Sequence, residues 1–183
     1  NKYITTDFAE AQVELVTPTF EDIDELYDFL FSLHVYVAKN IDSDEMLWPL
    51  SMPPKIENES EINLGYYHQS GIGLLKHVYR RGLKARYGST MQCVSGMHYN
   101  FSLKQASFTD LVESPNQKKI SEAYLGLIRN FKRVYWFVLC EFGQTNVVDK
   151  SFVKNREHNL KELNKSDMFL KHATSLRMSE IGY

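Results

Sequence analysis

Residues 90–103, TMQCVSGMHYNFSL, are the most informative part of the sequence. Read with a period of two, they divide into two faces, as they would in a β-strand. The odd-numbered face, which includes Met97 and Phe101, is mainly apolar and is expected to pack against a core. The even-numbered face, which includes Gln92 and His98, carries no acidic residue, lysine or arginine. This face either lines a polar cavity or contacts solvent, and the sequence leaves both interpretations open.

Three helices are predicted on either side of this stretch. Residues 19–37 have acidic residues in their first turn and then apolar residues at steps of three and four, which is typical of an amphipathic helix. The predicted helices at residues 73–87 and 118–142 end before Gly88 and Gly143, because glycine commonly terminates helices. The third helix is expected to bury a stripe formed by Ile120, Tyr124, Leu127, Phe131, Val138 and Phe142.

The order of these elements indicates the fold class. An alternation of apolar and polar residues over residues 12–16 predicts a short strand that Pro18 closes. Residues 42–71 are expected to be irregular because prolines interrupt them. The resulting order of strand, helix, helix, strand and helix lacks the regular alternation of a doubly wound sheet. The sequence therefore favours an α+β domain with an antiparallel sheet.

The composition excludes several classes of protein. A chain of 183 residues, 43% of them hydrophobic, suits one domain with a sizeable core. Its two cysteines, Cys93 and Cys140, form no disulfide framework, so a reducing, cytoplasmic location is expected. The apolar runs are shorter than the roughly 20 residues that a membrane-spanning helix needs, so no membrane is expected as a partner. The chain begins with Asn1, and we expect it to be a piece of a longer polypeptide.

Acidic and basic residues are separated along the chain. Residues 1–70 contain 14 acidic and 3 basic residues, whereas residues 71–183 contain 9 acidic and 18 basic residues. Two oppositely charged segments packed against each other would explain this separation. So would a cleft with an acidic, cation-binding side and a basic, phosphate-binding side. Residues 76–86 carry five positive charges, which suit a solvated helix face, a phosphate-binding surface or a nucleic-acid-binding surface.

The sequence lacks the motifs of several common enzyme classes. It contains neither a P-loop nor a zinc-binding cluster of cysteines and histidines. Asp7 and Glu14 have carboxylates of the kind that bind a hard cation such as Mg²⁺, although acids beside a strand also suit a solvated edge. His98 is either a metal ligand or a hydrogen-bonded core histidine.

Six segments carry a family resemblance: ITTDFAEAQVELVTP (4–18), MLWPLSMPP (46–54), VYRRGLKARYG (78–88), SGMHYNFSL (95–103), ISEAYLGLIRNF (120–131) and ATSLRMSEIGY (173–183). Taken together and in this order, they resemble glutamate–cysteine ligases of the proteobacterial type, also called γ-glutamylcysteine synthetases. The resemblance covers the whole chain. The blocks WPLSMP and HYNFS are its most specific parts.

The resemblance implies an α+β fold like that of glutamine synthetase, in which helices cover an antiparallel sheet curved into a half-funnel. Residues 1–183 would be part of a single catalytic domain, with a preceding metal-binding strand and a C-terminal portion absent. The implied enzyme is an ATP-dependent ligase that joins the γ-carboxylate of L-glutamate to L-cysteine through a γ-glutamyl phosphate. This reaction is the first step of glutathione biosynthesis, and it requires Mg²⁺, for which Mn²⁺ is an alternative.

Motif positions imply roles for individual residues in metal and phosphate binding. The implied metal ligands are Asp7, Glu14 and His98. Arg177 matches a catalytic anchor for a substrate carboxylate or phosphate, a task that suits a planar guanidinium. Arg80 is a weaker candidate for contact with phosphate.

Other motif positions match the family's substrate-binding residues. Val94 and Asn100 are expected to contact glutamate. A small, partly aromatic pocket suits the short side chain of cysteine. The residues that match this pocket are Phe8, Tyr79, Leu83, Gln92 and Tyr183.

Two other functions remain open on the sequence. A catalytically silent binding module would keep the fold without the chemistry. Because parts of the family's metal and ATP sites are absent, the isolated chain is itself expected to be inactive. A nucleic-acid-binding protein is suggested only by residues 76–86. The ligase interpretation instead expects glutamate, cysteine and ATP as ligands and no nucleic acid.

Overall fold

The computed structural model describes residues 2–67, 70–143, 145–154 and 156–181. The chain divides into two compact units, Asn1–Ser95 (unit 1) and Gly96–Tyr183 (unit 2), which are described separately. The assignment of residues 1–183 to one catalytic domain stays a prediction.

Unit 1 begins with a β-hairpin. Strand β1 (Ile4–Thr6) pairs antiparallel with β2 (Val13–Leu15), and Thr6 lies opposite Val13. The short strand predicted from the alternation over residues 12–16 is therefore confirmed. The rings of Tyr3 and Phe29 meet edge to face with 5.2 Å between their centroids, which connects the hairpin to the helix that follows.

Helix α1 (Ile23–Asn40) confirms the first predicted helix. Its N-cap is Asp22, whose carboxylate accepts hydrogen bonds from the backbone amides of Asp24 and Glu25 at 2.8 and 3.0 Å. This contact satisfies two of the amides that a helix N-terminus leaves without partners. Leu33 and Val37 are the buried residues of this helix.

Helix α2 (Gly71–Tyr87) confirms the second predicted helix. The Ser70 hydroxyl caps its N-terminus by accepting from the Gly73 amide at 3.2 Å. Gly88 ends it with a φ of 80°, a conformation that favours glycine. The same glycine precedes the short helix α3 (Ser89–Gln92). A single 3₁₀ turn, η1 (Glu59–Glu61), lies in the irregular segment between α1 and α2.

The long strand predicted over residues 90–103 is wrong. Residues 89–92 are helical, and residues 94–103 have no regular secondary structure. The Glu59 carboxylate accepts hydrogen bonds from the amides of Ser89 and Thr90, and this contact caps a helix N-terminus at these residues. Met91 of the face expected to be apolar and buried is buried, but farther along the same face Met97 is 89% exposed and Phe101 is 60% exposed.

Unit 2 contains α4 (Ser107–Leu111) and the long helix α5 (Gln117–Phe142), which confirms the third predicted helix. The carboxamide oxygen of Asn116 caps α5 by accepting from the Lys119 amide at 3.0 Å. Near its N-terminus, α5 packs on α4, where the rings of Phe108 and Tyr124 lie 5.2 Å apart.

The predicted burial of a stripe along α5 is wrong for this chain. Of the residues that the structure describes in α5, none is buried, and Phe142 is 77% exposed. A helical stripe is buried only where another surface covers it. The packing on α4 provides such a surface near the N-terminus of α5.

The last part of unit 2 is a three-stranded antiparallel sheet with the order β3-β5-β4. Its strands are β3 (Val147–Asp149), β4 (Lys161–Glu162) and β5 (Asp167–Phe169), and the short helix α6 (Lys150–Val153) follows β3. A 3₁₀ turn, η2 (Leu176–Met178), comes after the sheet. The buried apolar side chains that the structure describes in this region are Val148, Phe152, Val153, Leu160, Met168, Leu176 and Ile181.

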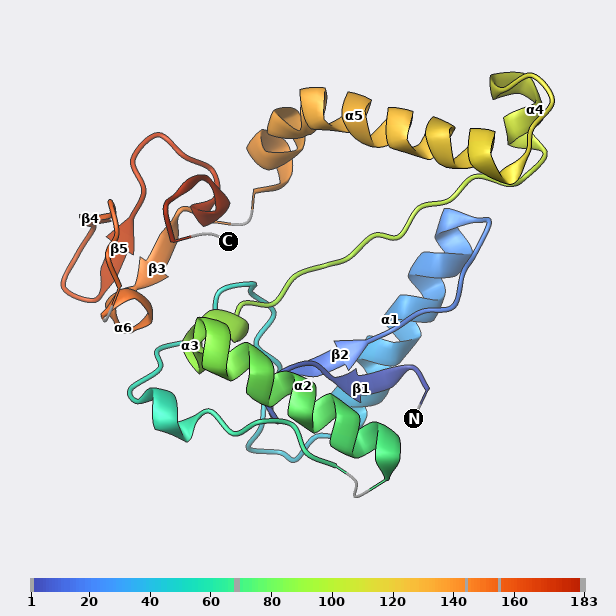
Figure 1. The fold of residues 1–183 in the computed structure, drawn as a ribbon. Helices are drawn as coiled ribbons and strands as arrows, with labels where there is room; N and C mark the ends of the chain where they lie inside the picture. Colours follow the sequence, from blue (N-terminus) through green and yellow to red (C-terminus); the bar gives the residue numbers. More distant parts are fainter. Residues whose placement is uncertain (1, 68–69, 144, 155, 182–183) are drawn as a thin grey trace. The chain divides into compact units, whose positions relative to one another are not determined.

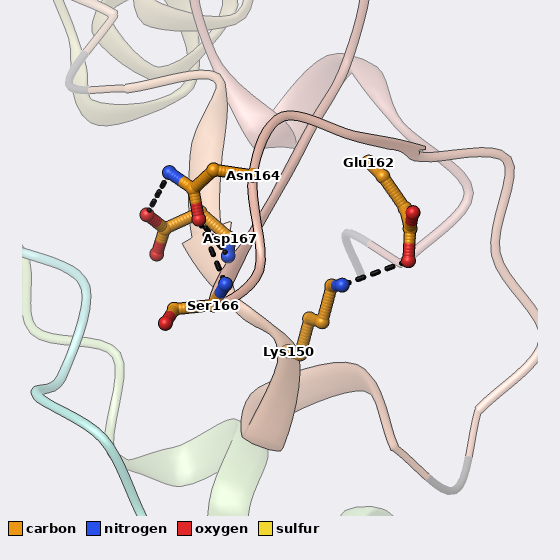
Figure 2. Close-up of polar contacts among 5 residues, drawn as sticks. All are labelled: Lys150, Glu162, Asn164, Ser166 and Asp167. Carbon is orange, nitrogen blue, oxygen red and sulfur yellow. Dashed lines mark hydrogen bonds and ion pairs between the residues drawn. The ribbon is translucent and has the colours of Figure 1, made fainter.

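Polar contacts close the turn between β4 and β5 (Figure 2). The Asn164 carboxamide oxygen accepts from the amides of Ser166 and Asp167 at 2.7 and 2.9 Å, and its Nδ2 donates to the Asp167 carboxylate at 2.7 Å. Lys150 and Glu162 form an ion pair at 2.7 Å, which lowers the pKa of the Glu162 carboxyl through its hydrogen bond and charge. These exposed contacts shape the hairpin and suggest no ligand.

Helices and small antiparallel sheets occur together in the chain (Figure 1), so the predicted α+β class is confirmed. None of the described helices is both long and apolar enough to span a membrane.

Candidate functional site

The candidate site is centred on residues 7–12, which connect β1 to β2 and are called the hairpin turn below. The Asp7 amide donates to the Gln12 carbonyl at 3.1 Å, and the Gln12 amide donates to the Ala9 carbonyl at 3.0 Å. The Gln12 side chain also accepts from the Ala9 amide at 2.8 Å. Phe8 is only 2% exposed, whereas the Asp7 side chain contacts solvent. The turn therefore places an exposed carboxylate beside a buried ring.

A second segment, residues 63–67, pairs with the hairpin turn. The Glu10 amide donates to the Asn63 carbonyl at 2.8 Å, and the Gly65 amide donates to the Phe8 carbonyl at 2.9 Å. The Tyr67 hydroxyl donates to the Glu10 carbonyl at 2.9 Å. This pairing explains how a six-residue turn keeps one conformation, because its backbone groups have partners outside the turn.

Arg80 of α2 connects these two segments. Its Nε donates to the Asp7 carbonyl at 2.6 Å, its Nη1 to the Gly65 carbonyl at 2.7 Å and its Nη2 to the Thr6 carbonyl at 2.7 Å. The residue is 7% exposed. Contact between Arg80 and phosphate stays a prediction, and this geometry favours a structural role instead.

Gly65 allows this approach, because a Cβ there would lie 2.9 Å from Thr6 Cγ2 and 3.2 Å from Arg80 Cζ. Those distances are shorter than van der Waals contact, so glycine is the residue that fits. Neither Gly65 nor Gln12 has a local signal in the sequence, since both roles depend on contacts with distant residues.

Helix α3 lies against the same turn. The Gln12 Nε2 donates to the Gln92 carbonyl at 3.1 Å and to the Ser95 hydroxyl at 3.3 Å. Gln92 Nε2 is buried and has no hydrogen-bond partner among the described residues. Buried polar atoms without partners are uncommon and require an explanation. Gln92 Nε2 is therefore a hydrogen-bond donor without an acceptor at the end of α3. Gln92 is also one of the residues that match the family's cysteine pocket.

The contacts of Arg80 and Gln12 bring together the hairpin turn, α2 and α3 in unit 1 (Figure 1). Four of the five predicted cysteine-pocket residues are on these elements. Tyr79 and Leu83 flank Arg80 on α2, where Tyr79 is 66% exposed and Leu83 is half-buried. Phe8 and Gln92 come from the turn and from α3. Tyr183 lies outside the described residues.

Two of the three predicted metal ligands are on the hairpin. Glu14 lies opposite Thr5, and Asp7 follows Thr5 by two residues. Because opposite residues share a face of a hairpin, Glu14 lies on the same face as Thr5, whereas Asp7 follows the end of β1 and begins the turn. Both side chains are exposed. Two exposed carboxylates on one hairpin fit the oxygen-ligand chemistry of Mg²⁺.

The third predicted ligand, His98, belongs to the irregular segment of unit 2 and is exposed. Among the residues that the structure describes, no three His, Cys, Asp or Glu side chains are grouped so that they would hold a metal ion. The three-ligand metal site therefore stays a prediction, with two of its members on one hairpin.

The remaining predicted site residues are in three places. Val94 is exposed just after α3, and Asn100 is exposed in the irregular segment of unit 2. The backbone of Arg177 is part of η2. Their contacts with substrate stay predictions.

Cys93 lies beside α3 and is protonated at neutral pH. Burial, with a smaller contribution from the charge of Glu59, raises the pKa of its thiol from 9.0 to about 11. Its Sγ is 3.5 Å from the Ser89 carbonyl. A thiol with this pKa is a poor nucleophile at pH 7, because the thiolate is the reactive form.

Comparisons with known proteins identify the family of this chain. The glutamate–cysteine ligase family model matches residues 1–183. Glutamate–cysteine ligase from Bordetella bronchiseptica is 44% identical over 185 residues, which cover 100% of this chain and 35% of the relative. The enzyme of the same name from Pseudomonas putida is 43% identical over 188 residues, which cover 100% of this chain and 36% of that relative.

A solved structure is similar over nearly the same range. The crystal structure of glutamate–cysteine ligase from Francisella tularensis in complex with AMP matches 98% of this chain and 36% of its own, with a TM-score of 0.88 and 35% sequence identity. The chain thus has the fold of part of that protein, and it spans about a third of the length of the curated relatives. Since the match extends over every residue, including the hairpin turn, α2 and α3, the chain belongs to the glutamate–cysteine ligase family.

Proposed function

We propose that this chain is part of an ATP-dependent ligase that joins the γ-carboxylate of L-glutamate to the amine of L-cysteine. The observation that carries the proposal is the match of the whole chain to the glutamate–cysteine ligase family. The AMP in the Francisella tularensis structure supports an adenine nucleotide as a ligand of the complete protein. The product is γ-glutamylcysteine, and the reaction begins glutathione biosynthesis in the cytoplasm.

The reaction has two chemical steps. A γ-carboxylate oxygen of glutamate attacks the terminal phosphorus of ATP, which forms γ-glutamyl phosphate and releases ADP. The cysteine amine then attacks the acyl carbon, so that a C–N bond forms, the C–O bond to phosphate breaks and the amine proton passes to solvent. When bound, Mg²⁺ or Mn²⁺ neutralises charge on the phosphate oxygens. Positioning of the substrates is therefore the main task of the protein.

In this proposal, Asp7 and Glu14 would hold the cation. Their exposure and their place on the same hairpin support this role, because a cation that binds together with ATP must be reached from solvent. His98 would supply a third ligand through an imidazole nitrogen. Arg177 anchors a carboxylate or phosphate of the substrates, for which its planar fork is suited.

Cysteine binds beside the hairpin turn. The ring of Phe8 and the α2 residues Tyr79 and Leu83 would surround its short side chain, and Tyr183 would complete the pocket. The unpartnered Nε2 of Gln92 supports this location, since a polar group of the substrate would give that donor its acceptor. Val94 and Asn100 contact glutamate.

The test measures ADP release by the complete gene product. We expect release to require glutamate, cysteine and Mg²⁺ together, with γ-glutamylcysteine identified by mass. Nucleotide binding without joint dependence on the two amino acids would instead identify a catalytically silent module. Titration with duplex and single-stranded DNA at two salt concentrations tests the nucleic-acid alternative, for which no binding is expected even at low salt.

A further inference from the structure

Arg80 is a buried cation for which the described residues provide no acidic partner. All three of its hydrogen bonds go to backbone carbonyls, those of Thr6, Asp7 and Gly65, at 2.6–2.7 Å. Burial of a charge is unfavourable unless hydrogen bonds compensate it. Bonds from a charged donor are short and strong, as these are. The local fold therefore depends on this guanidinium, and the guanidinium depends on the three carbonyls.

The direction of two of these carbonyls is informative. In a β-strand, successive carbonyls point to opposite edges. The carbonyls of Thr6 and Asp7 are consecutive, yet both accept from one guanidinium. The chain must therefore leave the strand conformation here, which agrees with the end of β1 at Thr6. Arg80 thus holds the bend at which Asp7 and Phe8 begin the hairpin turn.

We propose that Arg80 is a positioning residue for the cation and cysteine sites. It acts through the backbone of Asp7, which carries one proposed metal ligand, and of the neighbouring Phe8, which lines the proposed cysteine pocket. This inference rests on the proposed function for the roles of Asp7 and Phe8, whereas the contacts that hold the turn stand on the structure alone.

Lysine cannot replace arginine in this arrangement. The three acceptors are served by three different nitrogens of one planar group. A lysine ammonium is a single point charge and cannot contact all three from one position. Arg80→Lys therefore keeps the positive charge but loses the simultaneous hydrogen bonds to the three carbonyls. Arg81, the next residue on α2, is exposed, so Arg81→Lys is a matched control.

The experiment compares these two variants in the complete gene product. We expect Arg80→Lys to raise the KM for cysteine and the Mg²⁺ concentration for half-maximal rate by about tenfold each, the usual effect of losing a charge-assisted hydrogen bond. The KM for ATP should change less than threefold, and Arg81→Lys should resemble the wild type. A lower kcat with unchanged requirements for cysteine and Mg²⁺ would overturn the proposal, because it would show a purely structural role.

Gly65→Ala is the second variant, and it remains informative if Arg80→Lys does not fold. It keeps an arginine at position 80 but introduces a Cβ 2.9 Å from Thr6 Cγ2 and 3.2 Å from Arg80 Cζ, so the Thr6 side chain and the guanidinium must both shift. We expect the same selective rise in the cysteine and Mg²⁺ requirements. Unchanged requirements in a folded Gly65→Ala protein would contradict the proposal.

Hydrogen exchange separates a failure of this inference from a failure of the proposed function. The Gly65 and Glu10 amides are bonded across the turn and report its integrity. We expect faster exchange of both in Arg80→Lys than in Arg81→Lys, whether or not the wild type releases ADP. A wild type without ligase activity would overturn the proposed function. Equal exchange in the two variants would overturn the role of Arg80.

Discussion

Gln12 in the hairpin turn donates a hydrogen bond from its side-chain Nε2 to the backbone carbonyl of Gln92 in α3, at 3.1 Å. Eighty residues of sequence separate these partners. The same Gln12 side chain accepts from the Ala9 amide. One carboxamide therefore closes the turn and attaches it to α3, so that the two parts of the proposed cysteine pocket keep their relative positions.

Removal of that carboxamide should affect stability and cysteine binding together. Gln12→Ala loses the bonds to Ala9, Gln92 and Ser95, and we expect a decrease of about 1–3 kcal/mol in the free energy of unfolding. The KM for cysteine should rise as well. Urea denaturation and steady-state kinetics measure both quantities, and the exposed Gln105→Ala serves as the control. Equal stability of the two variants would contradict this role for Gln12.

Glu14→Gln should abolish most of the turnover with little effect on stability. The substitution keeps the volume of the side chain but removes the charge that binds the cation. Because Glu14 is exposed, its loss should leave the melting temperature nearly unchanged. ADP release over a range of Mg²⁺ concentrations tests this, with Glu122→Gln on α5 as a matched exposed control. Activity close to that of wild type at saturating Mg²⁺ would mean that Glu14 is a solvated strand residue.

Tyr79→Ala should raise the KM for cysteine much more than that for ATP. A ring lost from a small pocket removes contacts of about 1–3 kcal/mol, which is a change of roughly tenfold to a hundredfold. Tyr79 is largely exposed in this chain, so a general packing defect is not expected. Kinetics with each substrate varied in turn provide the measurement. Equal changes for glutamate, cysteine and ATP would assign Tyr79 to packing instead.

Cys93 should make the folded state less stable at alkaline pH. Its pKa is raised in the folded state from 9.0 to about 11, so the unfolded chain loses this proton first. Stability is therefore fully present below about pH 9 and decreases as the pH rises towards 11. Denaturation at pH 8 and pH 10 measures the effect, and Cys93→Ser should reduce the difference.

A second readout is alkylation at pH 8, which should be slower at Cys93 than at the exposed Cys140. Equal alkylation rates would contradict the burial of Cys93.

The exposed apolar face of α5 should make the 183-residue polypeptide associate on its own. Its residues Ile128, Phe131 and Phe142 are all more than half exposed, and large exposed apolar patches promote association. We expect concentration-dependent oligomers in analytical ultracentrifugation and binding of a hydrophobic dye. Phe131→Glu should reduce both, whereas Lys132→Glu should not. A monomer without dye binding would contradict this prediction.

Local signals in the sequence determined the three long helices and the family. The periodicity of α1, α2 and α5 lies within each helix, and the glycines that end α2 and α5 follow them directly. A helix forms largely from contacts among residues three and four apart. The motif blocks likewise identify the family without reference to the fold. These blocks alone are therefore sufficient to indicate Asp7, Phe8 and Tyr79 as candidate site residues.

Tertiary structure decided the rest, because long-range partners override local patterns. Residues 90–103 alternate like a strand, but the carboxylate of Glu59 caps a helix at Ser89 instead. Arg80 lies in a basic stretch of sequence that is typical of a solvated helix face. It is nevertheless buried, because its guanidinium donates hydrogen bonds to three carbonyls that are more than a dozen residues away in the sequence. Whether a pattern is buried depends on what covers it, and neither the exposed stripe of α5 nor the buried guanidinium of Arg80 could be inferred from residues near in sequence.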